Sequence, residues 1–149
     1  MPNIIFIGTK MHKYYIIVYI IALRIECMFK LLLSIKCTFI AFLGYFEGKI
    51  VIFGAGHRAV MFINLLQIAD VISAVIDDDE RKQGLFIPGT RVPIESSSYL
   101  GDNTVGSCIF AIGIDAEKKL AELFSSRFDH PLQYYSISPD SSLALPIFQ

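Results

Sequence analysis

Short apolar runs alternate with polar clusters from residue 48 onward. The apolar runs have the length of buried strands and lie at residues 50–53, 71–76, 108–112 and 133–137. Between them, residues 57–67 and 116–124 carry apolar side chains at helical spacing. Strands that alternate with helices are typical of a parallel sheet covered by helices on both faces. The pattern therefore predicts an α/β fold, a Rossmann-like parallel sheet flanked by helices, over residues 48–149.

The segments between these elements are predicted from their turn residues. Residues 77–93 contain Gly84, Pro88, Gly89 and Pro93, which predict a long loop. Residues 96–100 begin with three serines and predict a short helical turn, and residues 139–149 predict a tail. For the helix 57–67, the expected buried side consists of Val60, Phe62, Ile63 and Leu66.

Residues 1–47 have a different pattern and are predicted as a separate apolar N-terminal segment. Residues 3–8 suggest a short strand, and residues 25–45 a helix. The apolar stripe expected on this helix consists of Met28, Leu31, Leu32, Ile35, Phe39 and Leu43. Further apolar residues widen the stripe beyond that of a solvated helix. The segment is therefore expected to need a partner surface, either a catalytic domain or a second copy of the chain.

A membrane span is not the favoured interpretation of this segment. Arg24, Glu26, Lys30 and Lys36 interrupt it, whereas a spanning helix needs about 20 predominantly apolar residues. The apolar run at residues 14–23 is not followed by the small-residue cleavage site of a signal peptide. A non-enzymatic, membrane-associated interaction protein stays open as an alternative.

Composition and charge exclude several classes of protein. The chain has 149 residues, of which 54% are hydrophobic and 18% charged, which excludes a disordered protein. Its net charge of −1 offers no basic excess for nucleic acid. Cys27, Cys37 and Cys108 form no metal-ligand pattern, so no metal site is expected. We interpret them as small buried thiols of a reduced, cytoplasmic protein.

The first candidate site is the glycine pattern that follows the strand at 50–53. Gly54, Gly56 and Ala59 form a G-x-G-x-x-A sequence, and Asp77 follows Gly54 by 23 residues, at the end of the next strand. In dinucleotide-binding βαβ units these positions make the tight turn, admit a pyrophosphate and bind a ribose hydroxyl. His57 and Arg58 would bind an anion together with the helix dipole. The alternative is a tight turn and a solvated acidic loop without a ligand.

A family resemblance appears in the loop after Asp77. Residues 82–94, KQGLFIPGTRVPI, resemble the KQG-x-x-x-PG-[ST]-x-x-PI segment in the C-terminal domain of the sugar C-methyltransferase family. The sequences FGAGH at 53–57, FINLL at 62–66, VIDDD at 75–79 and SISP at 136–139 are similar to it as well. The resemblance extends from about residue 49 to residue 146.

The resemblance implies a substrate-holding module that works with a separate catalytic domain. The family uses S-adenosylmethionine to methylate a carbon of nucleotide-linked deoxysugars, and this Rossmann-like domain follows a catalytic domain that holds the methyl donor. A second βαβ donor site and the cysteine-rich zinc region of the family find no counterpart in residues 1–149. We therefore expect a truncated chain, a module that holds the nucleotide-sugar, with no catalytic residue and no cofactor of its own.

The resemblance adds residues of the 77–93 loop to the candidate site. Pro88 and Gly89 would form a rigid turn, and Lys82, Thr90 and Arg91 would donate hydrogen bonds to phosphates. We expect this loop at the carboxyl ends of the strands, where α/β sheets bind ligands. The candidate nucleotide-sugar site thus comprises Gly54, Gly56, His57, Arg58, Asp77, Lys82, Pro88, Gly89 and Thr90.

Two other interpretations stay open. The glycine pattern and the DDDxxKxG loop at 77–84 also resemble the nucleotide-sugar-binding domain at the front of sugar acetyltransferases, and the glycine pattern alone allows a small NAD(P)-binding protein. No nucleophilic triad is visible. His130 with Pro131 predicts a turn, and Asp115 with Glu117 is interpreted as the charge pattern of a first helical turn.

Overall fold

The computed structural model describes residues 21–31, 33–34, 36–37, 41 and 48–146. The chain divides into two compact units, Met1–Ser34 and Ile35–Gln149, and each is considered by itself. The predicted strand at residues 3–8 lies outside the described residues, as do most positions around the predicted boundary at residue 47. Both expectations stay predictions.

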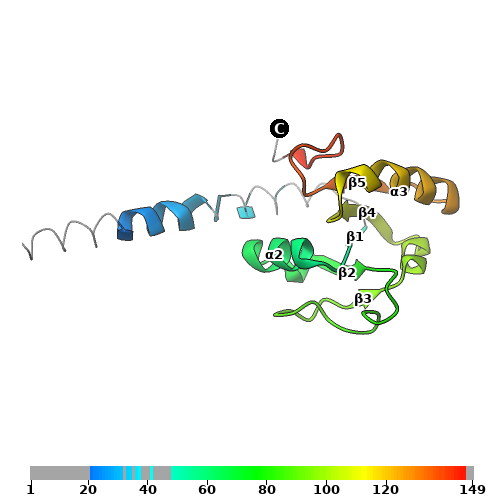
Figure 1. The fold of residues 1–149 in the computed structure, drawn as a ribbon, viewed down its shortest axis with the longest axis horizontal. Coiled ribbons are helices and arrows are strands. Elements are labelled where there is room, and N and C mark those ends of the chain that lie inside the picture. The colour runs from blue at the N-terminus through cyan, green and yellow to red at the C-terminus, as the bar shows by residue number, and fades with distance from the viewer. Residues whose placement is uncertain (1–20, 32, 35, 38–40, 42–47, 147–149) are drawn as a thin grey trace, which may run out of the picture. The chain divides into compact units, whose positions relative to one another are not determined.

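The second unit is built on a parallel sheet (Figure 1). Within the described residues its strands are β1 (Lys49–Phe53), β2 (Ile72–Ile76), β3 (Ile94–Glu95), β4 (Val105–Phe110) and β5 (Gln133–Ser136). Their order across the sheet is β3-β2-β1-β4-β5, and every neighbouring pair is parallel. This arrangement confirms the predicted Rossmann-like α/β fold.

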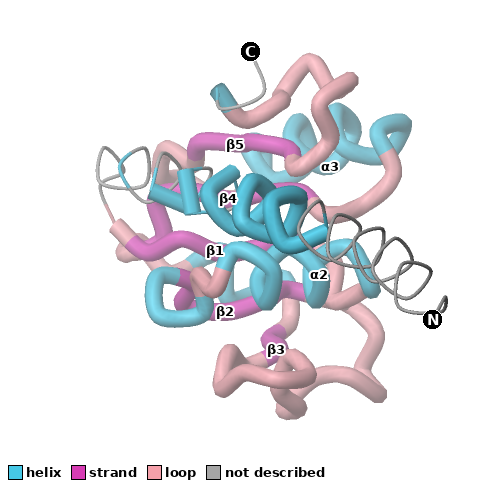
Figure 2. The backbone as a smooth tube through the Cα atoms, turned by 90° about the vertical axis from the view of Figure 1, so that its left-hand side faces the viewer, coloured by secondary structure: helices cyan, strands magenta, loops and turns pink. Residues whose placement is uncertain are grey.

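Two helices provide the main crossovers between parallel strands. Helix α2 (His57–Leu66) connects β1 to β2, and helix α3 (Ile114–Arg127) connects β4 to β5. Short 3-10 turns at Ala69–Val71 and Ser97–Gly101 precede β2 and β4. In Figure 1, α2 lies to the left of the strands and α3 to the right, so that the helices cover opposite faces of the sheet (Figure 2).

The alternation of side chains along the strands creates a core on each face. Ile52 of β1 packs in one cluster with Ala59, Ile63 and Leu66 of α2. Its neighbour Phe53 points to the other face and meets Phe124 of α3, with 5.3 Å between ring centroids. The central strands are therefore apolar on both sides, as the short continuous apolar runs in the sequence require.

The element boundaries differ from the predicted ones where polar residues are buried. Strand β4 begins at Val105, three residues earlier than expected, because Gly106 and the buried Ser107 belong to it. The two-residue strand β3 is too short to give an alternating pattern, and α3 is longer at both ends than predicted. On α2, Ile63 and Leu66 are buried as expected, but Val60 and Phe62 are half-buried.

The predicted tail at 139–149 is, up to residue 146, a packed segment. Ser136 forms a parallel bridge with Ala144, and the backbone N–H of Leu145 donates to the Ser136 carbonyl over 3.0 Å. Ser138, Ser141, Ala144 and Leu145 are buried. The prediction of a tail was wrong here because serines carry no apolar signal, although they can be buried when hydrogen-bonded.

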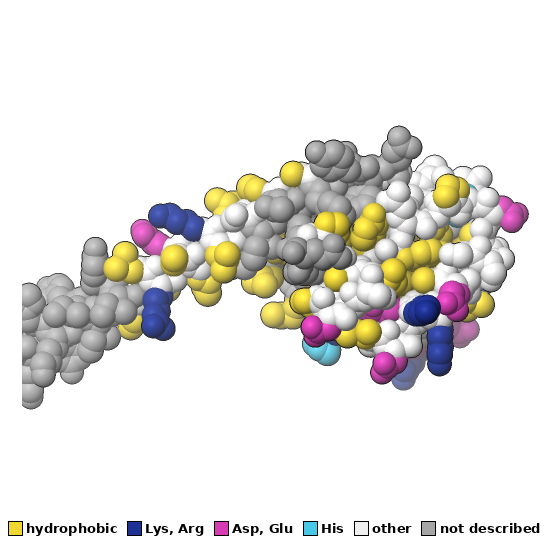
Figure 3. All heavy atoms as spheres, turned by 90° about the horizontal axis from the view of Figure 1, so that it is seen from above, with side chains coloured by type: hydrophobic (Ala, Val, Ile, Leu, Met, Phe, Trp, Pro, Cys, Tyr) yellow, Lys and Arg dark blue, Asp and Glu magenta, His cyan; other side chains and the backbone are white. Residues whose placement is uncertain are grey.

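The described residues of the first unit, 21–31 and 33–34, are helical, in agreement with the predicted helix but from an earlier start. Their side chains are exposed, including Met28, Phe29 and Leu31 at 53%, 65% and 62%. Figure 3 shows hydrophobic side chains projecting from this helical stretch. Among the described residues, no helix combines the length and the hydropathy that a membrane crossing requires.

The expectation of three buried thiols was correct for Cys108 only. Cys108 lies in the middle of β4 and is fully buried. Cys27 and Cys37 are exposed. Cys27 belongs to the helical stretch whose described side chains are all exposed, so its apolar sequence neighbours do not cover it.

Candidate functional site

The candidate site lies where the strand order reverses. β2 and β3 follow on one side of β1, whereas β4 and β5 follow on the other. In open α/β sheets ligands bind at the carboxyl ends of the two strands that flank such a reversal. Here those ends lead into Gly54–Arg58 after β1 and Ala111–Gly113 after β4. We call these two loops the switch-point edge.

Gly54 makes the tight turn at the end of β1. Its φ is 105°, a left-handed value that favours glycine, and its N–H donates to the Ile76 carbonyl over 2.7 Å. A Cβ on Gly54 would lie only 2.7 Å from Cγ2 of Ile112. The residue therefore serves both the turn and the close approach of the two loops of the switch-point edge.

Gly56 leaves the start of α2 open. It is the N-cap residue, is exposed, and has no heavy atom within 4 Å of the position that a Cβ would occupy. The first turn of α2 contains no acidic residue and no side-chain cap. Because the first N–H groups of a helix lack intrahelical partners and carry the positive end of the dipole, this end favours an anion.

Arg58 and His57 bring side chains to the same helix start. The Arg58 guanidinium donates from Nη1 to the Ile112 carbonyl and from Nη2 to Oγ of Ser138. These bonds tie the Arg58 side chain to the loop after β4 and to the segment after β5. A guanidinium has further N–H donors, so Arg58 can still bind a ligand anion. His57 is exposed at the first position of the helix.

Asp77 fastens the glycine loop from the end of β2. Its Oδ2 accepts from the Ala55 N–H and from Lys82 Nζ, both over 2.8 Å, and its Oδ1 accepts from the Asp79 N–H over 2.9 Å. Burial raises the pKa of this carboxyl, but the Lys82 hydrogen bond and the two backbone N–H groups together lower the pKa below 3.8. Asp77 and Lys82 are thus engaged with each other, and the ribose role of Asp77 stays a prediction.

The Pro88–Gly89–Thr90 turn does not lie at the switch-point edge. Asn64, near the carboxyl end of α2, donates from Nδ2 to the Pro88 carbonyl over 3.0 Å. Thr90 donates from its N–H and Oγ1 to the Ile87 carbonyl over 3.0 and 2.9 Å. Gly89 has a φ of 81°, and a Cβ there would lie 2.8 Å from Asn64 Oδ1.

The expected position of the 77–93 loop was therefore wrong for this turn, although Lys82 lies at the carboxyl end of β2 as expected. Thr90 and Arg91 line a cavity of about 370 Å³ together with Ile72 and Ser73, at the amino end of β2. Since β3 is parallel to β2, the connection must run back along β2 before β3 begins at Ile94, and here it runs back as far as Ile72 and Ser73. Gly54, Gly56, Arg58, Asp77 and Lys82 are brought together, whereas Pro88, Gly89 and Thr90 are not.

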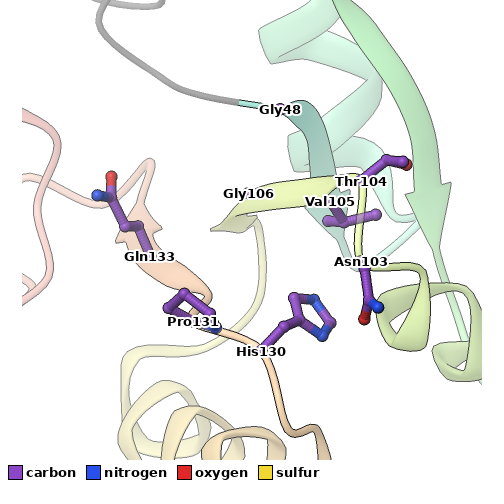
Figure 4. Close-up of a pocket in the computed structure, with 8 residues that line it drawn as sticks. All are labelled: Gly48, Asn103, Thr104, Val105, Gly106, His130, Pro131 and Gln133. Atoms are coloured by element: carbon purple, nitrogen blue, oxygen red, sulfur yellow. The ribbon is translucent and has the colours of Figure 1, made fainter.

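A larger cavity of about 630 Å³ also lies at the amino edge (Figure 4). Gly48, Val105 and Gln133 line it from the starts of β1, β4 and β5, together with His130. None of the described residues that line it carries an Asp, Glu, Lys or Arg side chain. Nε2 of His130 is buried and has no hydrogen-bond partner in the described part of the chain. His130 and Pro131, predicted as a turn before the last strand, lie in a bend and irregular segment before β5 and border this cavity.

The sequence did not reveal Glu117 as a buried residue. It was predicted as part of the charge pattern of a first helical turn, and it does lie in the first turn of α3, but its side chain is only 2% exposed. Its Oε1 accepts from the Ser136 hydroxyl over 2.6 Å, and its Oε2 accepts from the Ser141 hydroxyl. The helical spacing from Glu117 to Leu120 and Phe124, which face the sheet, was the signal that could have identified it.

Within the described ranges, no group of three or more His, Cys, Asp or Glu side chains is arranged to hold a metal ion. A search of curated proteins finds no match to the chain. Residues 34–107 match the family model of the C-methyltransferase C-terminal domain, which spans β1, α2, β2, β3 and the first residues of β4. The switch-point loop after β1, with Gly54, Gly56 and Arg58, lies inside the matched range, as do Asp77 and Lys82. In residues 34–107 the chain is therefore similar to the C-methyltransferase C-terminal domain.

Proposed function

We propose that this chain is a nucleotide-sugar-binding module of a C-methyltransferase-type protein, and that the diphosphate of the ligand binds at the start of α2. The observation that carries the proposal is the open helix start, with an exposed Gly56 and no acidic residue in its first turn. Arg58, fixed beside it, adds a positive charge. The family match supports the C-methyltransferase type of protein, and the resemblance of residues 82–94 to sugar C-methyltransferases suggests the substrate class.

The proposed binding mode uses backbone and side chain together. The first-turn N–H groups of α2 donate to one phosphate, and the remaining N–H donors of Arg58 form charge-assisted hydrogen bonds with it. His57 is exposed next to them and contacts the ligand when it binds. Asp77 accepts a hydrogen bond from the Ala55 N–H and so holds the glycine loop in place. Lys82 in turn donates to Asp77.

Methyl transfer itself is assigned to another part of the protein. In this proposal S-adenosylmethionine and the catalytic base belong to a catalytic domain, and the module described here presents the nucleotide-sugar to it. The exposed helical stretch of residues 21–31 and 33–34 is proposed to contact that domain. We assign no catalytic residue within the described ranges, and we propose the cytoplasm as the location of the module.

Calorimetric titration of the full chain tests this function. We expect binding of thymidine diphosphate and of thymidine diphosphate sugars, but no binding of thymidine. Because a hydrogen bond to a charged group contributes about 1.5–3 kcal/mol, Arg58→Ala should weaken diphosphate binding at least about tenfold. The matched control is Arg91→Ala, an exposed arginine at the amino edge of β2, which should bind as the wild type does.

Two results would argue against the proposal. Binding of NAD(H) or NADP(H) without binding of thymidine diphosphate would instead support the small dinucleotide-binding protein. Tight binding of S-adenosylmethionine by this chain would contradict the assignment of the methyl donor to another domain.

A further inference from the structure

A chain of buried polar groups connects α3 with Arg58. It consists of Glu117, Ser136 and Ser138, which are 2%, 0% and 4% exposed. The Ser136 hydroxyl donates to Oε1 of Glu117 over 2.6 Å, and the Ser138 N–H donates to Oγ of Ser136 over 2.9 Å. Oγ of Ser138 then accepts from Nη2 of Arg58. The start of α3 is thereby linked to the side chain that we place at the phosphate.

A second arm holds the same segment. The Ser141 hydroxyl donates to Oε2 of Glu117, and the Ser141 N–H donates to the Ser138 carbonyl over 3.1 Å. Oγ of Ser141 accepts in turn from the Leu143 N–H over 3.1 Å. Both carboxylate oxygens of Glu117 therefore hold residues 136–143 in the conformation that places Ser138 beside Arg58.

Glu117 is an unusual residue to bury for packing alone. No ion pair in the described part of the chain involves it. Desolvation of a carboxylate is costly, and a buried ionic group is often replaced by apolar side chains without loss of stability. An ionised carboxylate, however, only accepts hydrogen bonds. It therefore forces both serine hydroxyls to donate to it, which leaves their oxygens to accept from the backbone.

We propose that Glu117 is a positioning residue for the phosphate site at the start of α2. Its carboxylate orders the segment 136–143, and Ser138 of this segment holds the Arg58 guanidinium in the orientation that binds the anion. This inference rests on the proposed function for its effect on affinity, although the ordering of Arg58 itself does not require a ligand.

The affinity test uses Glu117→Gln alone and combined with Arg58→Ala. The amide keeps the shape of the side chain but brings an NH₂ group that donates, so one serine has to reverse its hydroxyl. Loss of about one hydrogen bond corresponds to a roughly three- to tenfold weaker binding of thymidine diphosphate. In the Arg58→Ala background the same substitution should leave the affinity unchanged. An equal loss in both backgrounds would show a merely structural role and overturn the proposal.

A measurement without ligand separates this inference from the proposed function. In ¹⁵N NMR spectra of the free full chain, the Arg58 guanidinium should show restricted rotation in the wild type. Glu117→Gln and Ser141→Ala should remove the restriction, whereas Glu122→Gln, an exposed glutamate on the same helix, should keep it. If Glu117→Gln does not fold, Ser141→Ala alone decides.

Unchanged Arg58 signals in the folded variants would overturn the inference even if thymidine diphosphate binds. Altered Arg58 signals in a chain that does not bind thymidine diphosphate would support the positioning role and contradict the proposed function.

Discussion

The two glycines of the β1–α2 loop differ in what their backbones require. Gly54 has a φ of 105° and lies against Ile112, so Gly54→Ala should reduce the free energy of unfolding by about 1–3 kcal/mol. Gly56 has a φ of −102° and open space around it. We expect Gly56→Ala to change stability by less than about 1 kcal/mol, and to weaken diphosphate binding because its methyl group enters the anion position. Urea denaturation and calorimetry measure the two effects, and equal destabilisation by both substitutions would contradict them.

Asp77 makes a contribution to stability that depends on pH. Its side chain is 14% exposed and receives three hydrogen bonds, so Asp77→Asn should cost about 1–2 kcal/mol at neutral pH. Since the pKa of the folded state lies below 3.8, the contribution is fully present above the unfolded pKa and is lost as the pH falls through the folded one.

The stability difference between wild type and Asp77→Asn should therefore be constant between about pH 5 and about pH 8, because this whole range lies at least about one unit above the unfolded pKa. The difference should shrink below about pH 4, which is close to the unfolded pKa itself. Asp129→Asn is the control, because Asp129 is exposed. A difference that persists undiminished at the lowest pH at which the protein stays folded would show that the carboxylate charge is not responsible.

The three cysteines should differ in reactivity towards a thiol reagent. Burial raises the pKa of the Cys108 thiol and keeps the reagent away, whereas Cys27 and Cys37 are exposed. We expect rapid labelling of Cys27 and Cys37 in the native chain, and labelling of Cys108 only in denaturant. Mass spectrometry of the labelled peptides checks this, and rapid native labelling of Cys108 would indicate that β4 is not an interior strand of the sheet.

Helix α2 (His57–Leu66) combines core packing with the proposed anion site on one short helix. Ile63 is fully buried against the sheet, whereas Met61 on the same helix is 60% exposed. Ile63→Ala should cost about 2–5 kcal/mol of unfolding free energy through the lost contacts and the cavity, and Met61→Ala less than about 0.5 kcal/mol. Thermal denaturation of both variants tests which face of α2 meets the sheet. Similar losses in both would mean that the helix is rotated from the orientation described.

The elements that could be predicted from the sequence are those with a local signal. The run Ile50–Val51–Ile52–Phe53 with the glycine turn identifies β1 and the start of α2, because an apolar strand and a G-x-G-x-x-A turn need no knowledge of distant residues. Strand β3 could not be predicted, since its two residues are fixed by pairing with Val75 and Ile76. The burial of Ser107 could not be predicted either, because it follows from the pairing of β4 with β1 and β5. The spacing of Glu117 indicates that it faces the sheet, but its serine partners lie elsewhere in the chain.

At the scale of the whole molecule, the candidate site is only partly visible in the sequence. Gly54, Gly56, Arg58 and Asp77 could be predicted together because a βαβ unit brings the carboxyl ends of its strands to one edge. The position of Thr90 could not, since it depends on how the loop returns to the parallel strand β3. Ser138 was missed as well, because its contact with Arg58 spans 80 residues.

The proposed site residues lie within the range that matches the family model, whereas the residues that support them lie outside it. The matched residues, 34–107, contain the glycine loop and Asp77, whereas Ser138 and Glu117, which hold Arg58 through the buried chain, lie outside the match. Residues beyond the match therefore support the side chain of Arg58, which lies within it. If the proposed site is correct, diphosphate binding needs both parts of the chain.

The location of the bound diphosphate tests this account most directly. Thymidine diphosphate is titrated into the ¹⁵N-labelled full chain, and the backbone amide shifts are followed by NMR. The account predicts that the largest shifts occur at Gly56, His57, Arg58 and Ala59, with smaller ones at Ile112 and Ser138. Shifts concentrated around Thr90 and Arg91, or around His130, would place the ligand at the amino edge of the sheet and contradict the proposed site. Absence of shifts at saturating ligand would contradict the proposed function.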